Sequence, residues 1–332
     1  MTEQTSEWAG LAVDIGNSKA DVAVVSADGQ QISWVRTGTI TPQRLGWDGC
    51  ASAIVRCLDA AAHADGTVVR AVYAAVAGVD FPDEEEQLSI ALARTGRFEE
   101  VIVRNDAYAL LASGEGLNEG VCVVAGAGMN CVGVHAGRHV RFAALGEISG
   151  DWGGGRDVAL AGLAAACRAQ DGRGCDTLLA RSVPDLFGVE SALDVTGLLH
   201  RGDLAITDVL PITELVFAAA RGGDKAAMAI ITRQAEEVAA FVRAAHVRLG
   251  LPIGAVPIVL GGSLLRLGGP VIHDAIAAQL LSDAPPIVVP GQPPIVGAVA
   301  GVTEMLGLNL RVHELEVRLG QPRSAEGARD AH

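Results

Sequence analysis

The stretch LAVDIGNSKADVAVVSADGQ (residues 11–30) reads as two strands joined by a polar turn that contains a glycine. Leu11–Ile15 is apolar, Ala20–Ser26 alternates loosely, and Ile32–Arg36 follows a second turn at residues 27–30. We therefore predict a β-meander. Walker A and dinucleotide-binding loops instead lead directly into a helix whose N-terminus holds the phosphates, and their glycine spacings are absent here. Both of those loop types are disfavoured.

Composition limits the possible partners. The chain has 332 residues, 50% hydrophobic and 19% charged, as expected for a soluble protein of two medium domains. Its net charge of -14 opposes nucleic-acid binding. No apolar run reaches the roughly 18–20 residues that span a bilayer, and the start MTEQTSEWAG does not resemble a signal peptide. We expect a cytoplasmic protein with a small-molecule partner, and neither a nucleic-acid nor a membrane partner.

The cysteines are scattered, and no two form a CxxC pair. We predict buried thiols rather than disulfides or a metal site for Cys50, Cys57, Cys122, Cys131, Cys167 and Cys175.

Further along, strands and helices alternate. In the first part we predict helices over Trp47–His63, Asp83–Thr95 and Ala107–Ser113, and strands over Val68–Val76 and Glu100–Val103. After a glycine-rich link at 113–120, a second meander is predicted over Val121–Ala125, Cys131–His135 and His139–Ala143. Helices should follow over Arg156–Ala169, Thr177–Arg181, Ser191–His200, Ile206–Arg221, Lys225–Leu249 and Pro270–Leu281, with short strands at Ile258–Leu260 and Ile287–Val289.

The two meanders form a weak internal repeat. We predict duplicated α/β domains that face each other across a cleft, with bounds at 9–115 and 116–319 and a flexible tail at 320–332.

Three glycine-rich turns each follow an apolar strand: Asp14–Lys19 (DIGNSK), Gly126–Asn130 (GAGMN) and Gly261–Ser263 (GGS). Each alone could be a tight turn that needs glycine. Together they resemble the phosphate 1, phosphate 2 and adenosine motifs of the actin–hexokinase–Hsp70 superfamily. The resemblance implies two ribonuclease-H-like (actin-like ATPase) domains whose hairpin amides bind the phosphates of ATP.

A narrower resemblance covers roughly residues 9–305. The stretches GAGMNCVGV, LGEISGDWGGGRDVAL, AAACRAQDGRG and RNDAYALLAS are similar to the BadF/BadG/BcrA/BcrD-type ATPase family, and within it to the N-acetylglucosamine kinase branch. This implies a homodimeric, Mg²⁺- and ATP-dependent kinase of an amino sugar, N-acetylglucosamine or glucosamine, at the 6-hydroxyl.

The resemblance also implies roles for single residues. Asp14 would contact Mg²⁺, commonly through water. The nucleotide would be bound by Gly16, Asn17, Ser18, Lys19, Gly126, Ala127, Gly128, Gly261, Gly262 and Ser263.

Asp106 is the predicted general base, which would accept the proton of the attacking sugar hydroxyl. Alternatively it caps the helix that follows. Asn105 either orients this base and binds the sugar or only caps the turn.

Further sugar contacts are expected at Asn130, Gly150, Asp151 and Thr41. Asp151 could instead cap the helix after Gly155. The neighbouring Trp152 could stack on the sugar or pack in the interior, and we favour packing.

Four positions depart from the family pattern, and one of them is Trp152, which stands where many relatives carry an acidic residue. Ala127 and Met129 replace hydroxyl side chains in the second turn, and Thr41 stands where the kinases tend to have an asparagine, which leaves the acetamido specificity open. Two alternatives to a kinase also remain open, an ATP-driven activator of a radical dehydratase with an iron–sulfur cluster and a non-catalytic sugar-sensing regulator.

Overall fold

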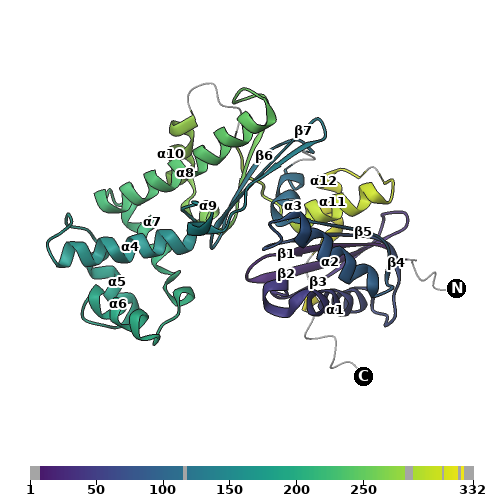
Figure 1. The fold of residues 1–332 in the computed structure, drawn as a ribbon, viewed down its shortest axis with the longest axis horizontal. Helices are drawn as coiled ribbons and strands as arrows, with labels where there is room; N and C mark the ends of the chain where they lie inside the picture. Colours follow the sequence, from purple (N-terminus) through teal and green to yellow (C-terminus); the bar gives the residue numbers. More distant parts are fainter. Residues whose placement is uncertain (1–7, 115–117, 281–286, 309, 321–322, 325–332) are drawn as a thin grey trace. The chain divides into compact units, whose positions relative to one another are not determined.

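The structure is a computed structural model, which describes residues 8–114, 118–280, 287–308, 310–320 and 323–324. It divides into two compact units (Figure 1). The first unit contains the chain up to Gly120 and returns from Val288 onward, and the second contains Val121–Ile287. The predicted bounds at 9–115 and 116–319 placed the C-terminal segment in the second domain. In the structure this segment belongs to the first unit, because its helices pack on the first sheet. Of the predicted tail, residues 321–322 and 325–332 lie outside the described residues.

The sheet of the first unit confirms the predicted β-meander. Its main strands are β1 (Trp8–Ile15), β2 (Lys19–Ser26), β3 (Ile32–Gly38), β4 (Val69–Val76) and β5 (Phe98–Asn105). They lie in the order β3-β2-β1-β4-β5, and the two-residue β11 (Arg323–Ser324) pairs with β3. Strand β1 is antiparallel to β2 and parallel to β4, which is in turn parallel to β5.

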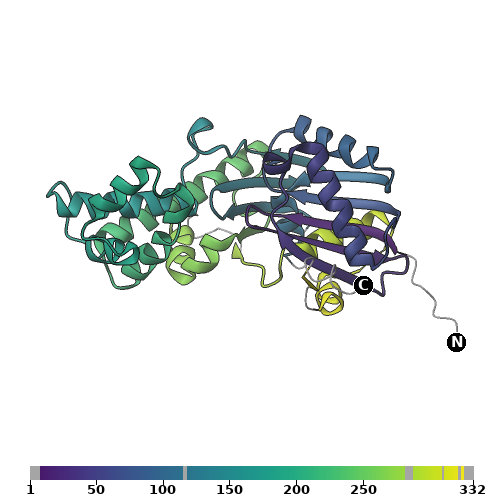
Figure 2. The same cartoon turned by 90° about the horizontal axis from the view of Figure 1, so that it is seen from below.

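Helices cover both faces of this sheet (Figure 2). On one face, α1 (Pro42–Ala62) and α2 (Pro82–Arg94) bury alternate β1 residues such as Leu11 and Val13. On the other, α3 (Asp106–Ala112), α11 (Ile295–Met305) and α12 (Val312–Leu319) surround the remaining apolar residues. This alternation is what period-two strands require when both faces are covered.

Two features of the first unit depend on glycines. Helix α1 is interrupted at Gly46, whose φ is 70°, and this break explains why the helical pattern in the sequence begins at Trp47. At Gly297 helix α11 crosses α3 so closely that a Cβ there would lie 1.8 Å from the Ala109 carbonyl oxygen.

The second unit repeats the topology of the first. Its strands are β6 (Gly120–Ala125), β7 (Met129–His135), β8 (Arg138–Arg141), β9 (Ile258–Gly261) and β10 (Ile287–Val288). They lie in the order β8-β7-β6-β9-β10. If the five strands of each unit are numbered along the chain, both sheets have the order 3-2-1-4-5. The internal repeat predicted from the two meanders is confirmed.

Helices dominate the rest of this unit. They are α4 (Gly155–Gln170), α5 (Leu179–Phe187), α6 (Ala192–Arg201), α7 (Ile212–Arg221), α8 (Lys225–Leu249), α9 (Ser263–Gly268) and α10 (Pro270–Leu280). The single helix predicted over Ile206–Arg221 is wrong, because a 3-10 turn over Ile206–Val209 ends before Pro211 and α7 begins after it. The predicted helix at Thr177–Arg181 starts two residues later and runs on to Phe187. The predicted end of the last helix, Leu281, lies outside the described residues.

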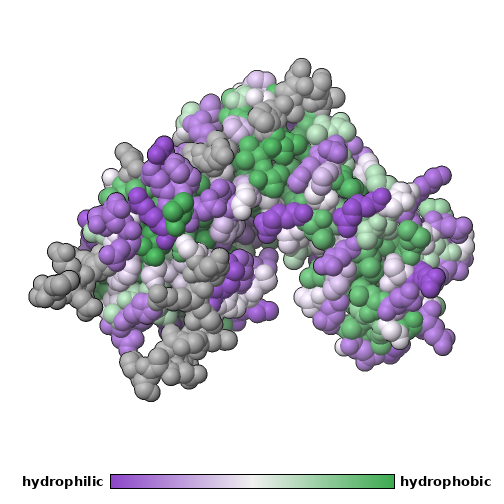
Figure 3. Space-filling model, turned by 180° about the vertical axis from the view of Figure 1, so that it is seen from behind, coloured by the Kyte–Doolittle hydropathy of each residue, from purple (hydrophilic) through white to green (hydrophobic). Residues whose placement is uncertain are grey.

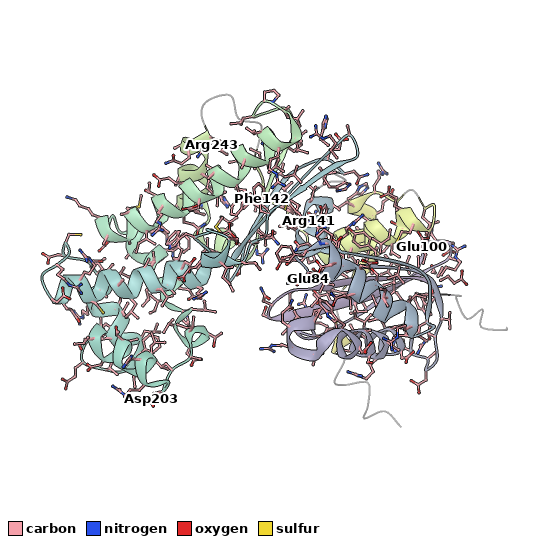
Figure 4. The ribbon with its side chains drawn as sticks, in the orientation of Figure 1. Glu84, Glu100, Arg141, Phe142, Asp203 and Arg243 are labelled. Carbon is pink, nitrogen blue, oxygen red and sulfur yellow. The ribbon has the colours of Figure 1, made fainter. Side chains whose placement is uncertain are left out.

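The long helix α8 packs on β8, which ends at Arg141 and is followed directly by Phe142 (Figure 4). The Phe142 and Phe241 rings meet edge to face at 5.0 Å, and Arg248 lies 4.8 Å from the Phe142 centroid.

Hydrophilic and apolar residues are interleaved on the face shown in Figure 3. In the described ranges no helix is both long and apolar enough to cross a membrane.

All six cysteines are free, and four are buried as predicted, but Cys167 is half-buried and Cys175 is exposed.

Candidate functional site

Three carboxylates lie at the carboxyl edge of the first sheet. Asp14 is near the end of β1, Asp80 follows β4, and Asp106 follows β5 directly. The registers Ile15↔Val76 and Val76↔Asn105 align the ends of these parallel strands. In open α/β sheets this edge is where ligands bind, because the turns that follow the strands point their side chains there.

Asp106 is the first residue of α3 and does not cap it, so the capping alternative for this residue is wrong. It is half-buried, and its pKa is raised to about 7 by burial first and by the charge of Asp80 second. The amides of Asp106 and Ala107 at the helix start act in the opposite direction. A carboxyl group with a pKa near neutrality suits proton transfer at physiological pH.

Asn105 is the cap of α3. Its Oδ1 accepts a hydrogen bond of 3.0 Å from the Ala107 amide. Its Nδ2 donates to the Val79 carbonyl at 3.2 Å and to Asp80 Oδ1 at 3.0 Å. The side chain is 2% exposed. Asn105 thus joins the turn that carries Asp106 to the loop that carries Asp80.

Asp14 is buried, and its pKa is raised to about 8. Burial is the largest cause, and the charges of Asp106 and Asp21 follow, while Lys19 and Arg36 lower the pKa. A positive charge added beside this carboxyl group would lower its pKa and favour the ionised form.

The first hairpin turn leaves backbone donors open. The Gly16 amide donates to the Lys19 carbonyl at 2.9 Å, and Thr39 Oγ1 donates to the Gly16 carbonyl at 2.6 Å. Asn17 and Ser18 are exposed, and neither amide has a hydrogen-bond partner within the described part of the chain. Successive open amides of this kind can bind an anion.

The second hairpin has the same feature. Ala127 and Gly128 are exposed, and their amides make no hydrogen bond to any described residue. The turn is held from behind by the start of α4, where the Gly155 amide donates to the Gly126 carbonyl at 2.7 Å and the Arg156 amide to Ala127 at 2.9 Å.

Gly154 is the residue that allows this contact. A Cβ on Gly154 would lie 2.5 Å from the Gly128 backbone, and its φ is 83°. Gly154 is also the N-cap of α4, so the alternative that Asp151 caps this helix is wrong.

Met129 explains one departure from the family pattern. Its side chain is buried, and its sulfur lies 2.9 Å from Nε2 of the fully buried Gln234. Gln234 Oε1 in turn accepts a hydrogen bond of 2.8 Å from the Gly154 amide. The side chain at position 129 therefore points into the unit and fastens α8 to the hairpin and the glycine run.

The GGS turn also packs against the second hairpin. Gly262 has a φ of 98°, and a Cβ there would lie 2.2 Å from the Ala125 carbonyl oxygen. Gly261 is the buried end of β9, and Ser263 is exposed. The structure thus brings the predicted nucleotide residues of the second unit together around the end of β6.

The predicted sugar contacts divide between the units. In the first unit, Thr41 is buried immediately before α1. In the second, Gly150 is exposed, Asp151 accepts a hydrogen bond from Ser149 Oγ, and Asn130 Oδ1 accepts one of 2.7 Å from the Cys131 amide.

Trp152, beside these residues, has a partner of its own. The Arg233 guanidinium lies 3.9 Å from the ring centroid, so one face of the indole is covered by a cation from α8.

Sequence reasoning missed four residues of these clusters. Asp80 had a usable signal, since VAGVD places it just beyond an apolar strand. Asp21, Arg36 and Gln234 gave none, because their partners depend on strand register and on a helix distant in the sequence.

The sequence pattern of the BadF/BadG/BcrA/BcrD ATPase family matches residues 11–300. The chain belongs to this family. The family resemblance stated from its motifs is thereby confirmed.

A relative from Clostridium acetobutylicum, an N-acetylmuramic acid/N-acetylglucosamine kinase, is 28% identical over 197 residues. The alignment covers 59% of this chain and 64% of that relative, which is less than two thirds of its length.

Solved structures confirm the fold. A provisionally named N-acetylglucosamine kinase from Chromobacterium violaceum superposes with a TM-score of 0.70 at 21% identity, covering 89% of this chain and 99% of that one. A ROK family glucokinase from Streptomyces griseus, solved with glucose and AMPPNP, gives 0.53 at 19% identity, with coverages of 89% and 99%. The chain has two actin-like, ribonuclease-H-like α/β domains, as predicted.

Proposed function

We propose that the protein is an ATP-dependent kinase that phosphorylates N-acetylglucosamine, or a closely related amino sugar, at its 6-hydroxyl. The observation that carries the proposal is Asp106, a half-buried carboxylate close to Asp14. The pKa of Asp106 is raised to about 7. Membership of the ATPase family supports the use of ATP, and the Clostridium acetobutylicum relative supports the class of sugar.

In the proposed reaction, Asp106 accepts the proton of the sugar 6-hydroxyl. The hydroxyl oxygen forms a bond to the γ-phosphorus, the bond from that phosphorus to the β,γ-bridging oxygen breaks, and ADP leaves. Asn105 holds the base in place through Asp80 and the α3 cap. We assign Asn105 this positioning role, since its amide is already bonded to protein groups.

The two hairpins would bind the phosphates through the open amides of Asn17, Ser18, Ala127 and Gly128. Glycines at 154 and 262 let neighbouring backbone support the second hairpin. Gly261, Gly262 and Ser263 are proposed to lie against the adenosine.

Asp14 fits Mg²⁺ by its chemistry. Among the described residues no three His, Cys, Asp or Glu side chains gather into a metal-binding group, so a single carboxylate would share the ion with phosphate and water, as Mg²⁺ prefers. The ion would supply positive charge to the reacting phosphates. That charge would also favour the ionised form of Asp14.

The sugar would be contacted by Thr41 in the first unit and by Asn130, Gly150 and Asp151 in the second. The acetamido preference remains part of the proposal, because Thr41 differs from the family pattern. A homodimer in the cytoplasm is likewise proposed.

An ADP-release assay on matched acceptors tests the function. N-acetylglucosamine, glucosamine, N-acetylmuramic acid and glucose are compared at equal concentration, with and without Mg²⁺. We expect Mg²⁺-dependent ADP release that requires an amino sugar, and mass spectrometry should show the phosphate at the 6-position. ADP release that no sugar stimulates would contradict the kinase and favour an ATPase activator.

A further inference from the structure

One buried carboxylate in the first unit forms ion pairs with two basic side chains. Asp21 is 0% exposed, and its Oδ1 lies 2.6 Å from Arg36 Nε. Its Oδ2 lies 2.9 Å from Arg36 Nη2 and 3.1 Å from Lys19 Nζ. A buried carboxylate needs one paired cation to offset its desolvation. Arg36 already meets this need with one contact to each carboxylate oxygen, and Lys19 adds a third contact.

Strand register places these charges in a row. Asp14 faces Asp21 across β1 and β2, and Asp21 faces Arg36 across β2 and β3, so the three side chains share one face of the sheet. The adjacent row on the same face, made of Ala12, Ala23 and Trp34, is buried in the apolar cluster under α11.

Trp34 of the apolar row contacts Arg36 of the charged row. Trp34 is anchored by a hydrogen bond of 2.8 Å from its indole nitrogen to the Leu319 carbonyl, and the Arg36 guanidinium lies 5.4 Å from its ring centroid. The bidentate contact with Asp21 then sets the orientation of the guanidinium plane. The Arg36 guanidinium is thus in contact with two groups, the Asp21 carboxylate and the Trp34 ring.

Both cations keep donors for another group. The Lys19 and Arg36 side chains are 43% and 40% exposed. Arg36 Nη1 and two of the three Lys19 N–H groups have no hydrogen-bond acceptor within the described residues. The row lies at the hairpin whose Asn17 and Ser18 amides are also open.

We infer that Arg36 and Lys19 form a cationic pair that binds the terminal phosphates of a nucleoside triphosphate, and that Asp21 is the residue that positions both. This inference rests on the proposed function and deepens it, since of these three residues only Lys19 was predicted from the sequence to bind nucleotide. Arg36 supplies the planar, weakly hydrated cation suited to phosphate oxygens. Asp21 acts only through the two cations and does not touch the nucleotide.

Titration calorimetry with ATP and with AMP, which lacks the terminal phosphates, tests the inference. We expect Arg36→Gln to weaken ATP binding about tenfold, the effect of losing a charge-assisted contact, and to leave AMP binding unchanged. The matched control is Arg94→Gln, because Arg94 lies on α2 of the same unit and its ion pair with Asp48 of α1 is exposed. It should change neither affinity.

Unchanged ATP affinity in Arg36→Gln would overturn this inference alone. If the unmodified protein bound no nucleotide, the proposed function would fail with it. An equal loss for ATP and AMP would also overturn the inference, because it would point to general damage.

The Asp21→Asn variant separates positioning from folding. We expect the same selective loss of ATP affinity. The double variant with Asp21→Asn and Arg36→Gln should bind ATP about as weakly as the weaker-binding of the two single variants, because both substitutions act through one contact. A lowered Tm with ATP and AMP affinities both intact would mean that Asp21 is only structural. If Asp21→Asn does not fold, Arg36→Lys replaces it, and its ATP affinity should fall between those of the unmodified protein and Arg36→Gln.

Discussion

Replacing Asp14 by asparagine should make the stability of the ligand-free protein less sensitive to pH. The pKa of Asp14 is raised from its ordinary value of 3.8 to about 8 in the folded chain. Between these two values the folded chain holds a proton that the unfolded chain has released. Stability therefore falls as pH rises through this window and is lowest above the folded pKa. Asparagine has the same shape and does not titrate.

The size of the effect follows from the window. Between about pH 6 and about pH 8.5 the unmodified protein should lose about 2.5 kcal/mol relative to Asp14→Asn, from a folded pKa of about 8. For a unit of this size that corresponds to a relative change in Tm of roughly 5–10 °C.

Urea unfolding in the presence of a chelator, followed by circular dichroism, measures the gap between variant and unmodified protein at both pH values. Asp48→Asn is the control, since its exposed carboxyl should give a gap that does not change with pH. The reasoning would be refuted if the free energy of unfolding of Asp14→Asn minus that of the unmodified protein stays constant or falls as the pH rises.

Three further predictions concern the site. Because the pKa of Asp106 is raised to about 7 and its ionised form is the base, kcat/KM should fall about tenfold per pH unit below that value, and a flat stopped-flow profile from about pH 5.5 to 8 would contradict this. Gly154→Ala should destabilise the second unit by about 1–3 kcal/mol and weaken ATP binding, measured by calorimetry, whereas Gly172→Ala, with a similar φ of 78° but open space, should leave ATP binding intact. Gly297→Ala should lower both Tm and kcat, since the new methyl group would displace the helix that carries Asp106, and retention of both values would show that this crossing is not rigid.

Local patterns in the sequence were enough to predict much of the fold. The two meanders and their glycine turns follow from short apolar strands separated by residues that favour tight turns, and these signals do not depend on distant contacts. The return of α11 and α12 to the first sheet could not be predicted this way. Their apolar faces fit either sheet, and only long-range packing, including the contact of Gly297 with Ala109, decides between them.

The candidate site divides in the same manner. Asp14 and Asp106 could be found because each lies at the end of an apolar strand. The partners of Asp21 could not, because a carboxylate inside an alternating strand is indistinguishable from an exposed one until the register with β3 is known. The break at Pro211 was predictable from the proline alone, and our single-helix prediction overlooked it.

The central claim is that Asp106 removes the proton from the sugar hydroxyl. The most direct measurement is a quench-flow assay of single-turnover phosphoryl transfer by Asp106→Asn, combined with calorimetry of ATP and N-acetylglucosamine binding. Our account predicts that both ligands bind within about threefold of the unmodified protein, while the transfer rate falls by about 10²–10⁴. Transfer at the unmodified rate with both ligands bound would contradict it.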